Sequence, residues 1–408
     1  MPSFRYLILG GGMVAGYAAQ AMAERGLAAG DLAIVSADSA LPYERPPLSK
    51  GFLAGKDTEA SVFISDAAFY REHGIELRIG ATVIGIDLGA KRLHTSGGEA
   101  IGFESLLIAT GAQPRTFNVP GAEQANIHYL RSLDDSRSIK ARIPAVRQAL
   151  VIGGGFIGME VAAVLAQQGV ATTLAFPEQR VWARFFTPEM SAFFQRYYRE
   201  RGVTLAAGER VTAFEPGQGE RQAVAITASG RRLPADLVVA GIGVRPVTGL
   251  FEQSGLVLDN GIVVNEYLET NVPGVYAAGD VAHYRDVLFE KTRRVEHWDN
   301  AVEQGKHAAR LLLGERVPFV HVPYFFSDDF DLSYELWGDT ADAERVVYRG
   351  DVTTSSFSAW WLAGTRLLAA FAMNRPDDER DAAQRWIADR TPVDAGRVQN
   401  DQRPLEEP

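Results

Sequence analysis

The sequence predicts an α/β protein in which two nucleotide-binding domains are followed by a smaller C-terminal α+β domain. Two glycine-rich stretches, at residues 10–16 and 153–158, each follow a buried apolar run and precede an apolar helical pattern. That order of strand, glycines and helix is the signature of a Rossmann-type dinucleotide-binding unit. After about residue 318 the pattern changes to alternating, aromatic-rich segments, which predict antiparallel strands.

The glycine motif in the middle of the chain is the more complete of the two. It places Gly153, Gly155 and Gly158 between an apolar strand and an apolar helix. The first glycine permits a tight turn, the second lets the backbone approach a pyrophosphate, and the third lets the helix pack on the strand. The helix N-terminus then offers unpaired N–H groups to the phosphates. One such motif is weak evidence, but this chain has two.

The first copy of the motif opens the chain and places Gly10, Gly12 and Ala15 at the three glycine positions. Alanine is an accepted variant at the third position. Asp38 lies just past the end of the next strand, where a carboxylate can bind ribose hydroxyls. Two such units about 140 residues apart imply two dinucleotides held by one chain. The alternative is a pair of glycine-rich turns without any ligand.

The composition excludes several classes of protein. The chain has 408 residues and a formal net charge of −10, which argues against binding of nucleic acid or an anionic membrane surface. No window approaches ~18 uninterrupted apolar residues, so we expect no membrane span. A strand predicted almost at Met1 leaves no room for a signal peptide, so a cytoplasmic location is expected.

The absence of cysteine restricts the chemistry further. No disulfide, iron–sulfur cluster, thiolate metal site or cysteine nucleophile can form, and we expect no bound metal. If the two bound dinucleotides act as redox cofactors, their electrons cannot pass through a cysteine pair of this chain. They must go directly to an external acceptor.

Other segments complete the predicted elements. The strand at 103–111 ends in Thr110 and Gly111, and the strand at 270–280 delivers Asp280 to a helix start, where a plain N-cap is the alternative. Residues after about Gly396 are polar and expected to be frayed. The remaining elements are a helix at 188–202 and strands at 83–87, 237–243, 324–326, 332–337, 357–361 and 367–373.

Residues 41–50 form a motif of a different kind. Two adjacent prolines fix a rigid turn, and Arg45 and Lys50 place cations close to a bound phosphate or flavin. The alternative is a loop that ends in a helix cap at Ser49.

With these pieces placed, the sequence resembles the FAD/NAD(P)H oxidoreductases that lack a redox disulfide. That family includes the ferredoxin reductases of cytochrome P450 and dioxygenase systems, the rubredoxin reductases, monodehydroascorbate reductase and apoptosis-inducing factor. The resemblance covers nearly the whole chain and is weakest in the last ~80 residues. The segments that carry it are 45–50, 109–111, 153–160, 278–280 and 296–301.

The resemblance implies a glutathione-reductase-like fold with three domains. Residues 1–113 and 248–316 would form the FAD-binding domain, 114–247 the NAD(P)H-binding domain, and 317–408 the C-terminal α+β domain. It also implies that Lys50 and Glu160 meet as an ion pair near the reacting atom of the flavin and act catalytically. The cofactor-binding residues that it implies are Gly10, Gly12, Val14, Ala15, Asp38, Arg45, Lys50, Val83, Thr110, Gly111, Arg131, Gly153, Gly155, Gly158, Glu160, Glu178, Gly243, Asp280, Glu296 and Trp298.

The choice of nicotinamide cofactor depends on the end of the second strand of the second unit. Phe176 replaces the carboxylate usual there, and it could stack on adenine, while Glu178 could bind the ribose. Arg180 and Arg184 could instead hold a 2′-phosphate. We expect NADH to be favoured over NADPH.

The resemblance implies a reaction but leaves its electron acceptor open. The first expectation is hydride transfer from NAD(P)H to FAD and single-electron transfer to a ferredoxin. A patch of Lys291, Arg293 and Arg294 would dock that acidic partner. One alternative is reduction of a small-molecule radical or quinone, favoured by stretches that resemble monodehydroascorbate reductase. The other is an NADH-sensing flavoprotein resembling apoptosis-inducing factor. Whichever acceptor is used, we expect the protein to be a monomer or a homodimer.

Overall fold

The computed structural model describes residues 1–218, 222–402 and 404–405. The chain divides into two compact units that interleave along the sequence. Unit 1 comprises residues 1–45, 59–113 and 244–321, and unit 2 comprises residues 46–58, 114–243 and 322–408, with the gaps given above. The three-domain division at 113, 247 and 316 stays a prediction.

Unit 1 is built on a sheet whose centre is β1 (Ser3–Leu9). The last four residues of β1 are buried, and β1 pairs in parallel with β2 and β6. An apolar run covered on both faces is typical of a parallel sheet. The strand order is β3 (Glu76–Arg78), β2 (Leu32–Val35), β1, β6 (Ala100–Ile108), β5 (Arg92–Thr95) and β4 (Val83–Asp87), with β18 (Val275–Ala277) also paired to β6.

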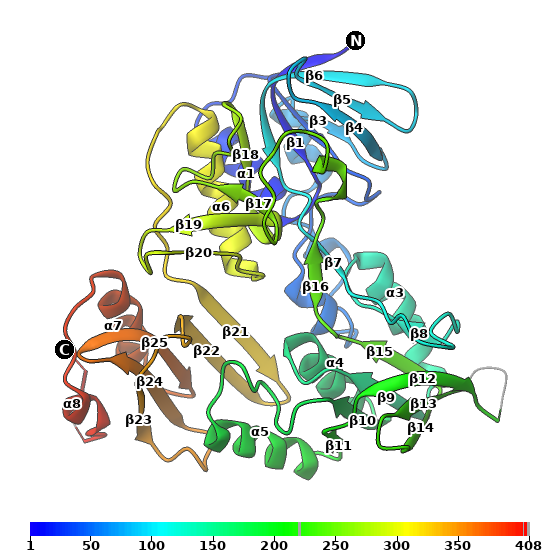
Figure 1. The fold of residues 1–408 in the computed structure, drawn as a ribbon, viewed down its shortest axis with the longest axis vertical. Coiled ribbons are helices and arrows are strands. Elements are labelled where there is room, and N and C mark those ends of the chain that lie inside the picture. The colour runs from blue at the N-terminus through cyan, green and yellow to red at the C-terminus, as the bar shows by residue number, and fades with distance from the viewer. Residues whose placement is uncertain (219–221, 403, 406–408) are drawn as a thin grey trace. The chain divides into compact units, whose positions relative to one another are not determined.

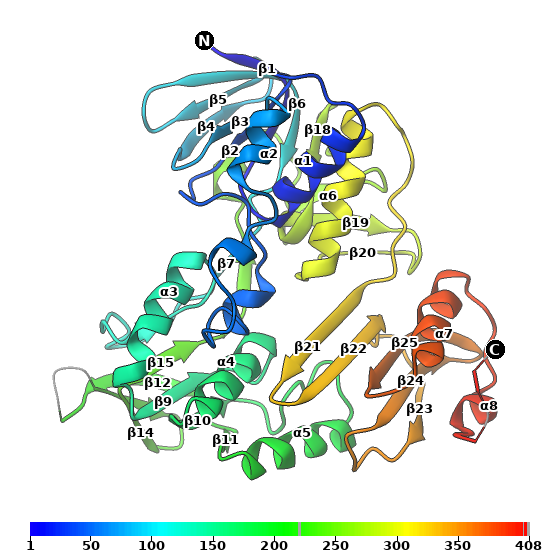
Figure 2. The same ribbon diagram turned by 180° about the vertical axis from the view of Figure 1, so that it is seen from behind.

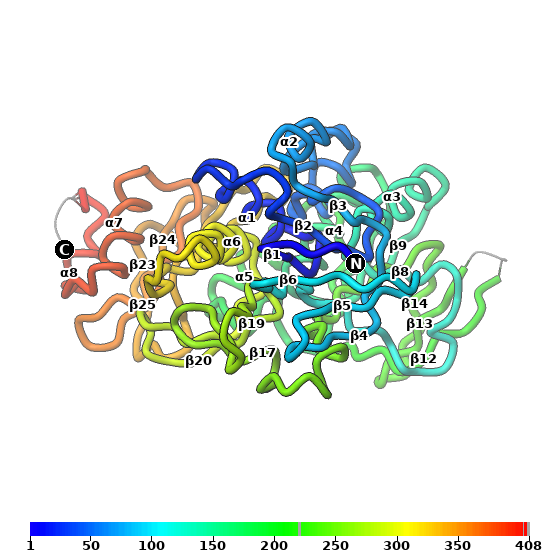
Figure 3. Tube along the Cα trace, turned by 90° about the horizontal axis from the view of Figure 1, so that it is seen from above, coloured from blue at the N-terminus to red at the C-terminus, as the bar shows by residue number. Residues whose placement is uncertain are grey.

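Two helices pack side by side on this sheet, α1 (Met13–Glu24) and α6 (Trp298–Leu312), as Figure 2 shows. The connection from β1 into α1 can be followed in Figure 3. The other elements of unit 1 are α2 (Ala67–Glu72) and a small sheet of β17 (Ile262–Val264), β19 (Ala282–Asp286) and β20 (Lys291–Arg293). The strands β7 (Ala112–Pro114) and β16 (Val244–Pro246) form a two-stranded sheet.

Two sequence expectations for unit 1 are wrong in detail. The strand expected at 103–111 is β6, which ends at Ile108, before Thr110. The strand expected at 270–280 is regular only over the three residues of β18. Asp280 lies inside a 3-10 turn whose N-cap is Ala278, so Asp280 is not a plain N-cap.

Unit 2 contains a second parallel sheet, as predicted (Figure 1). Its order is β11 (Thr204–Ala207), β10 (Ala171–Phe176), β9 (Gln148–Ile152), β15 (Leu237–Ala240) and β8 (Ile127–His128). The helices are α3 (Leu133–Arg142), α4 (Phe156–Gln167) and α5 (Pro188–Glu200). An antiparallel sheet that was not predicted consists of β12 (Val211–Pro216), β13 (Ala223–Thr227) and β14 (Arg232–Ala235).

The C-terminal segment of unit 2 is an antiparallel sheet with two helices. The four predicted aromatic-rich strands are present, and a fifth, β23, was missed. The order is β21 (Tyr324–Asp329), β22 (Leu332–Gly338), β25 (Arg366–Met373), β24 (Phe357–Ala363) and β23 (Arg345–Gly350), followed in the chain by α7 (Asp377–Ala388) and α8 (Ala395–Gln399). The predicted fold class, α/β with two dinucleotide-binding sheets and a C-terminal α+β part, is confirmed.

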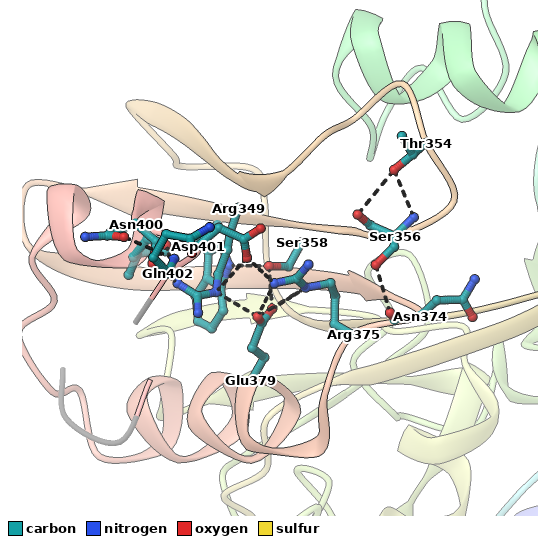
Figure 4. A network of polar contacts seen from close by, with 12 residues as sticks. Arg349, Thr354, Ser356, Ser358, Asn374, Arg375, Glu379, Asn400, Asp401 and Gln402 are labelled. Carbon is teal, nitrogen blue, oxygen red and sulfur yellow. Dashed lines mark hydrogen bonds and ion pairs between the residues drawn. The ribbon is translucent and has the colours of Figure 1, made fainter. Parts of the chain in front are cut away.

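The expectation of a frayed tail after about Gly396 is wrong for the described residues. Val398 is completely buried within α8, and the Asn400 carbonyl oxygen accepts a hydrogen bond from Arg349 of β23 (Figure 4). Among the described residues, no helix is long and apolar enough to cross a membrane.

Candidate functional site

The two glycine motifs form turns of the same geometry. Gly10 has a φ of 119° and Gly153 a φ of 121°, values that residues with a side chain rarely adopt. At each turn an added Cβ would lie 2.2 Å from a carbonyl oxygen, that of Ala109 or that of Gly241. Glycine is therefore required at both turns, which lead into α1 and α4.

The helix N-termini that follow these turns have the features of anion sites. Gly12 and Gly155 are the N-caps of α1 and α4, and no described side chain caps either helix. An added Cβ on Gly155 would have no described neighbour within 4 Å, so open space adjoins this backbone. Gly158 lies against the carbonyl oxygen of Gly153, where only glycine fits. The residues present therefore fit a pyrophosphate at each helix N-terminus.

In unit 1 the segment after β2 brings a cation to the first glycine turn. Asp38 accepts hydrogen bonds from the Ala40 N–H (3.0 Å) and the Tyr43 hydroxyl (2.9 Å). The Arg45 guanidinium lies over the Tyr43 ring, 5.6 Å from its centroid. An added Cβ on Gly12 would lie 3.8 Å from Arg45 Nη2, so the two predicted residues are adjacent.

A second group of unit 1 residues gathers at the start of α6. Trp298 Nε1 donates to Glu44 Oε2 (2.5 Å), and the Tyr17 hydroxyl donates to the other oxygen of Glu44. Burial, together with the hydrogen bond to Glu44, raises the pKa of the Tyr17 hydroxyl. Sequence reasoning missed Glu44, and its only signal was its place directly before Arg45.

Asp280 and Glu296 are linked through one arginine. Arg294 donates to the Asp280 carbonyl oxygen (3.1 Å) and forms an ion pair with Glu296.

The other predicted residues of unit 1 lie on three elements. They are Val14 and Ala15, buried in α1, Val83 at the start of β4, and Thr110 and Gly111 after β6, where the Thr110 hydroxyl donates to Val247 (3.0 Å).

The predicted docking patch is wrong for its two arginines. The side chain of Arg293 is 13% exposed and pairs with Asp286, which is itself buried. The side chain of Arg294 is 8% exposed and pairs with Glu296. Both guanidinium groups are neutralised by carboxylates of the same unit, so neither offers a free charge to a partner. The formal count of basic residues in a segment did not reveal this pairing.

In unit 2 the structure brings Lys50 and Glu160 together as an ion pair in which both side chains are mostly buried, at 16% and 5% exposure. Lys50 follows the 3-10 turn Pro46–Ser49, and Glu160 lies in the second turn of α4. Ser327 of β21 donates to Glu160 (2.7 Å), and the Ser49 hydroxyl also donates to it. Three donors from two separate segments therefore hold one carboxylate. The catalytic role of the pair stays a prediction.

Neither serine was singled out from the sequence for this contact. Ser49 was considered only as a helix cap, and Ser327 was given no role of its own. The ring of Phe326 lies 5.6 Å from Lys50 Nζ, so the flanking aromatic residue also contacts the cation.

The remaining predicted residues of unit 2 lie around these elements. The Arg131 N–H donates to Asp135 (3.1 Å) at the start of α3, and Ser136 of the same helix donates to the Leu48 carbonyl oxygen (2.7 Å). α3 is therefore tied to the segment that carries Lys50. Gly243 follows β15 with a φ of 93°, and Glu178 is exposed just after β10.

Two residues near the second glycine turn do not have the roles that the sequence left open for them. Phe176 is fully buried and packs beneath Gly154, so its ring is not available to stack on adenine. Arg180 donates to the carbonyl oxygens of Phe186 and Ala183 and to the Ser191 hydroxyl. Its guanidinium therefore holds its own loop together and does not face a phosphate.

Two family models match the chain. Residues 4–305 match the model described as pyridine nucleotide-disulphide oxidoreductase, and residues 324–407 match the one described as reductase C-terminal. The chain is 39% identical over 401 residues to peroxisomal monodehydroascorbate reductase 2 of Oryza sativa subsp. japonica, covering 93% of this chain and 84% of that protein. It is 35% identical to putidaredoxin reductase CamA of Pseudomonas putida, covering 93% and 90%.

Solved structures of related reductases also match nearly the whole chain. The crystal structure of the covalent putidaredoxin reductase–putidaredoxin complex matches with a TM-score of 0.95 at 34% identity and covers 100% of this chain and 98% of that chain. A ferredoxin reductase from Rhodopseudomonas palustris matches with a TM-score of 0.92 at 32% identity and covers 98% of both chains.

The fold and the two glycine turns define an oxidoreductase that uses dinucleotide cofactors. The chain belongs to the pyridine nucleotide-disulphide oxidoreductase family. Its cofactors are FAD and NAD(P)H, as the sequence predicted. Because it has no cysteine, it is a member without the redox disulfide.

Proposed function

We propose that the chain takes hydride from NADH with bound FAD and passes electrons singly to a ferredoxin-type protein. The buried Lys50–Glu160 pair, in a chain without cysteine, is the observation that carries this proposal. FAD when bound supplies the conversion from hydride to single electrons. The likeness to proteins named putidaredoxin reductase and ferredoxin reductase supports a protein acceptor.

The protein's own residues bind the two cofactors and orient them. The N-termini of α1 and α4 hold the two pyrophosphates, Arg45 adds a cation at the first, and Asp280 binds hydroxyls of the FAD chain. Lys50 supplies a positive charge that is fixed in place by Glu160. A cation positioned before the reaction stabilises negative charge that develops during hydride acceptance without reorganising.

The test is stopped-flow reoxidation of the NADH-reduced protein by a ferredoxin, a quinone or oxygen. We expect the ferredoxin to be the fastest acceptor. Its rate should fall as salt rises if charge guides docking, because attraction is screened over roughly 10 Å at ~0.1 M ionic strength. A quinone that outpaces every ferredoxin would contradict the proposal.

The second candidate is reduction of a small-molecule radical or quinone. It is favoured by the higher identity to the rice monodehydroascorbate reductase, 39% against 35% for putidaredoxin reductase. Two aromatic residues of the C-terminal sheet, Phe326 and Trp337, could contact a small acceptor, but Trp337 is 4% exposed and Phe326 is half-buried. Only Phe326 therefore offers appreciable surface to a small acceptor.

We expect a preference for NADH over NADPH. Exposed Glu178 can accept ribose hydroxyls and repel a 2′-phosphate, whereas Arg180 is already bound to its own loop. The measurement is kcat/KM for both cofactors. Glu178→Ala should lower kcat/KM for NADH roughly tenfold, since a charge-assisted hydrogen bond contributes ~1.5–3 kcal/mol. The control Arg184→Ala should leave kcat/KM unchanged for both cofactors, and a selective fall in kcat/KM for NADPH would show that Arg184 binds the 2′-phosphate.

Asp280→Ala is expected to purify with less bound flavin while keeping its fold. Asp280 is 9% exposed in the turn before β19, and its carboxylate is the group that we assign to the FAD chain. Losing this contact should weaken FAD binding roughly ten- to a hundredfold. The readout is flavin absorbance per folded protein, with circular dichroism as the control for folding. Full occupancy in a folded variant would remove Asp280 from the site.

The expected cytoplasmic location is retained as part of this proposal. Relatives such as the rice protein are named peroxisomal, so fractionation of expressing cells is the measurement that decides it.

A further inference from the structure

Asp329 is a fully buried carboxyl group to which the proposed function gives no role. It ends β21 at 0% exposure, whereas the preceding Asp328 is exposed. Because side chains alternate along a strand, Ser327 and Asp329 share one face of β21. Ser327 donates to Glu160 from that face, which places Asp329 on the same side of the strand as the Lys50–Glu160 pair.

Asp329 has far fewer donors than Glu160. The Tyr334 hydroxyl donates to Asp329 Oδ2 (2.6 Å), while Oδ1 is buried and accepts no hydrogen bond from any described residue. A carboxylate in this setting would carry a charge that is neither solvated nor paired, which is costly. Glu160 has a lysine and two hydroxyl donors, so the negative charge is better placed on Glu160 than on Asp329.

The hydrogen bonding of Tyr198 also suits a protonated acid. Tyr198 of α5 lies beside Asp329 and donates its own hydroxyl hydrogen to the Met159 carbonyl oxygen (3.2 Å). Its oxygen is left as an acceptor, which matches an acid O–H rather than a carboxylate. Burial first, and then the charge of Glu160, raise the pKa of Asp329 to about 7, against the opposing effects of the Tyr334 hydrogen bond and Lys50.

We propose that Asp329 is a positioning residue that is held as a neutral carboxylic acid on the acid side of neutrality and so leaves Glu160 as the carboxylate that Lys50 neutralises. This inference rests on the proposed role of Lys50 in hydride acceptance. When Asp329 loses its proton, a second negative charge forms beside Glu160 and offsets the positive charge of Lys50. Hydride acceptance then slows as pH rises through neutrality, because the fixed cation is less effective.

The first arm of the test is infrared spectroscopy of the intact flavoprotein in the absence of NADH. The difference spectrum of wild type minus Asp329→Asn should show the C=O band of a protonated carboxylic acid at about pH 6, and the band should disappear by about pH 8. Asp328→Asn is the matched control, because it removes an exposed carboxylate from the same strand and should remove no such band. A wild-type protein without the band at pH 6 would overturn the proposal.

The second arm is the pH profile of flavin reduction by NADH in single-turnover mixing. The wild-type rate should fall roughly threefold or more between about pH 6 and pH 8, and the Asp328→Asn profile should match it. The Asp329→Asn profile should be flat over this range because the amide cannot ionise. An Asp329→Asn profile that still falls as in wild type would show that Asp329 does not act on the pair.

Tyr334→Phe keeps the test decisive if Asp329→Asn does not fold. It removes the donor to Asp329 Oδ2, which favours the ionised form, so the acid band should persist to higher pH than in wild type. An unshifted band would overturn the assignment. The infrared arm needs no electron acceptor, so failure of the ferredoxin proposal leaves its result unaffected and the two failures can be told apart.

Discussion

Lys50→Met is expected to slow flavin reduction by NADH at least tenfold, about 1.4 kcal/mol of barrier. The substitution keeps an unbranched side chain that is shorter by the terminal atom, and it removes the Lys50 cation, which is 16% exposed and paired with Glu160. It also leaves a buried carboxylate with only hydroxyl donors, which should lower the free energy of unfolding by about 3 kcal/mol or more. The measurement is the single-turnover reduction rate, followed in the flavin absorbance.

Lys56→Met is the matched control, since Lys56 is exposed in the same segment and should have the wild-type rate. The double variant Lys50→Met with Glu160→Gln adds a second constraint. If the two residues act as one unit, the double variant should be hardly slower than Lys50→Met alone, because losses within a unit are not additive. A wild-type rate in Lys50→Met would exclude the pair from the chemistry.

The features that could be predicted from the sequence are those that depend on consecutive residues of one segment. The turn at Gly153 needs a strand, a glycine and a helix in consecutive residues, and the same holds at Gly10. The alternating aromatic strands of the C-terminal sheet are likewise local patterns. β23 was missed because it is an edge strand whose residues are mostly half-buried, so its alternation is weak.

The contacts that could not be predicted join segments far apart in the chain. Ser49, Glu160 and Ser327 meet from three distant stretches, and nothing in the spacing of those residues indicates it. Charge pairing is equally hidden, because Arg293 looks like a free cation until Asp286 is seen beside it. Phe176 was considered for stacking on adenine because its burial beneath the glycine turn is a tertiary property that the sequence does not reveal.

Glu379→Ala is expected to lower the free energy of unfolding by about 3–5 kcal/mol. Glu379 of α7 is buried and accepts hydrogen bonds from Arg349 (2.7 Å), Arg375 (2.6 Å) and the Ser358 hydroxyl (2.8 Å), as Figure 4 shows. Removing this carboxylate leaves two largely buried guanidinium groups without the charge they share. Arg349 also binds Asn400 and Arg375 binds Asp401, so the segment around these two residues should become less firmly held as well.

The measurement is urea unfolding, with limited proteolysis of the tail as the second readout. Asp378→Ala is the matched control, because Asp378 is the exposed neighbour on α7 and its loss should change stability by less than about 0.5 kcal/mol. A double-mutant cycle of Glu379→Gln with Arg349→Met should show a coupling of roughly 0.5–3 kcal/mol, since the two side chains are in direct contact. If Glu379→Ala unfolds like Asp378→Ala and its tail stays protected, the network does not stabilise the C-terminal sheet.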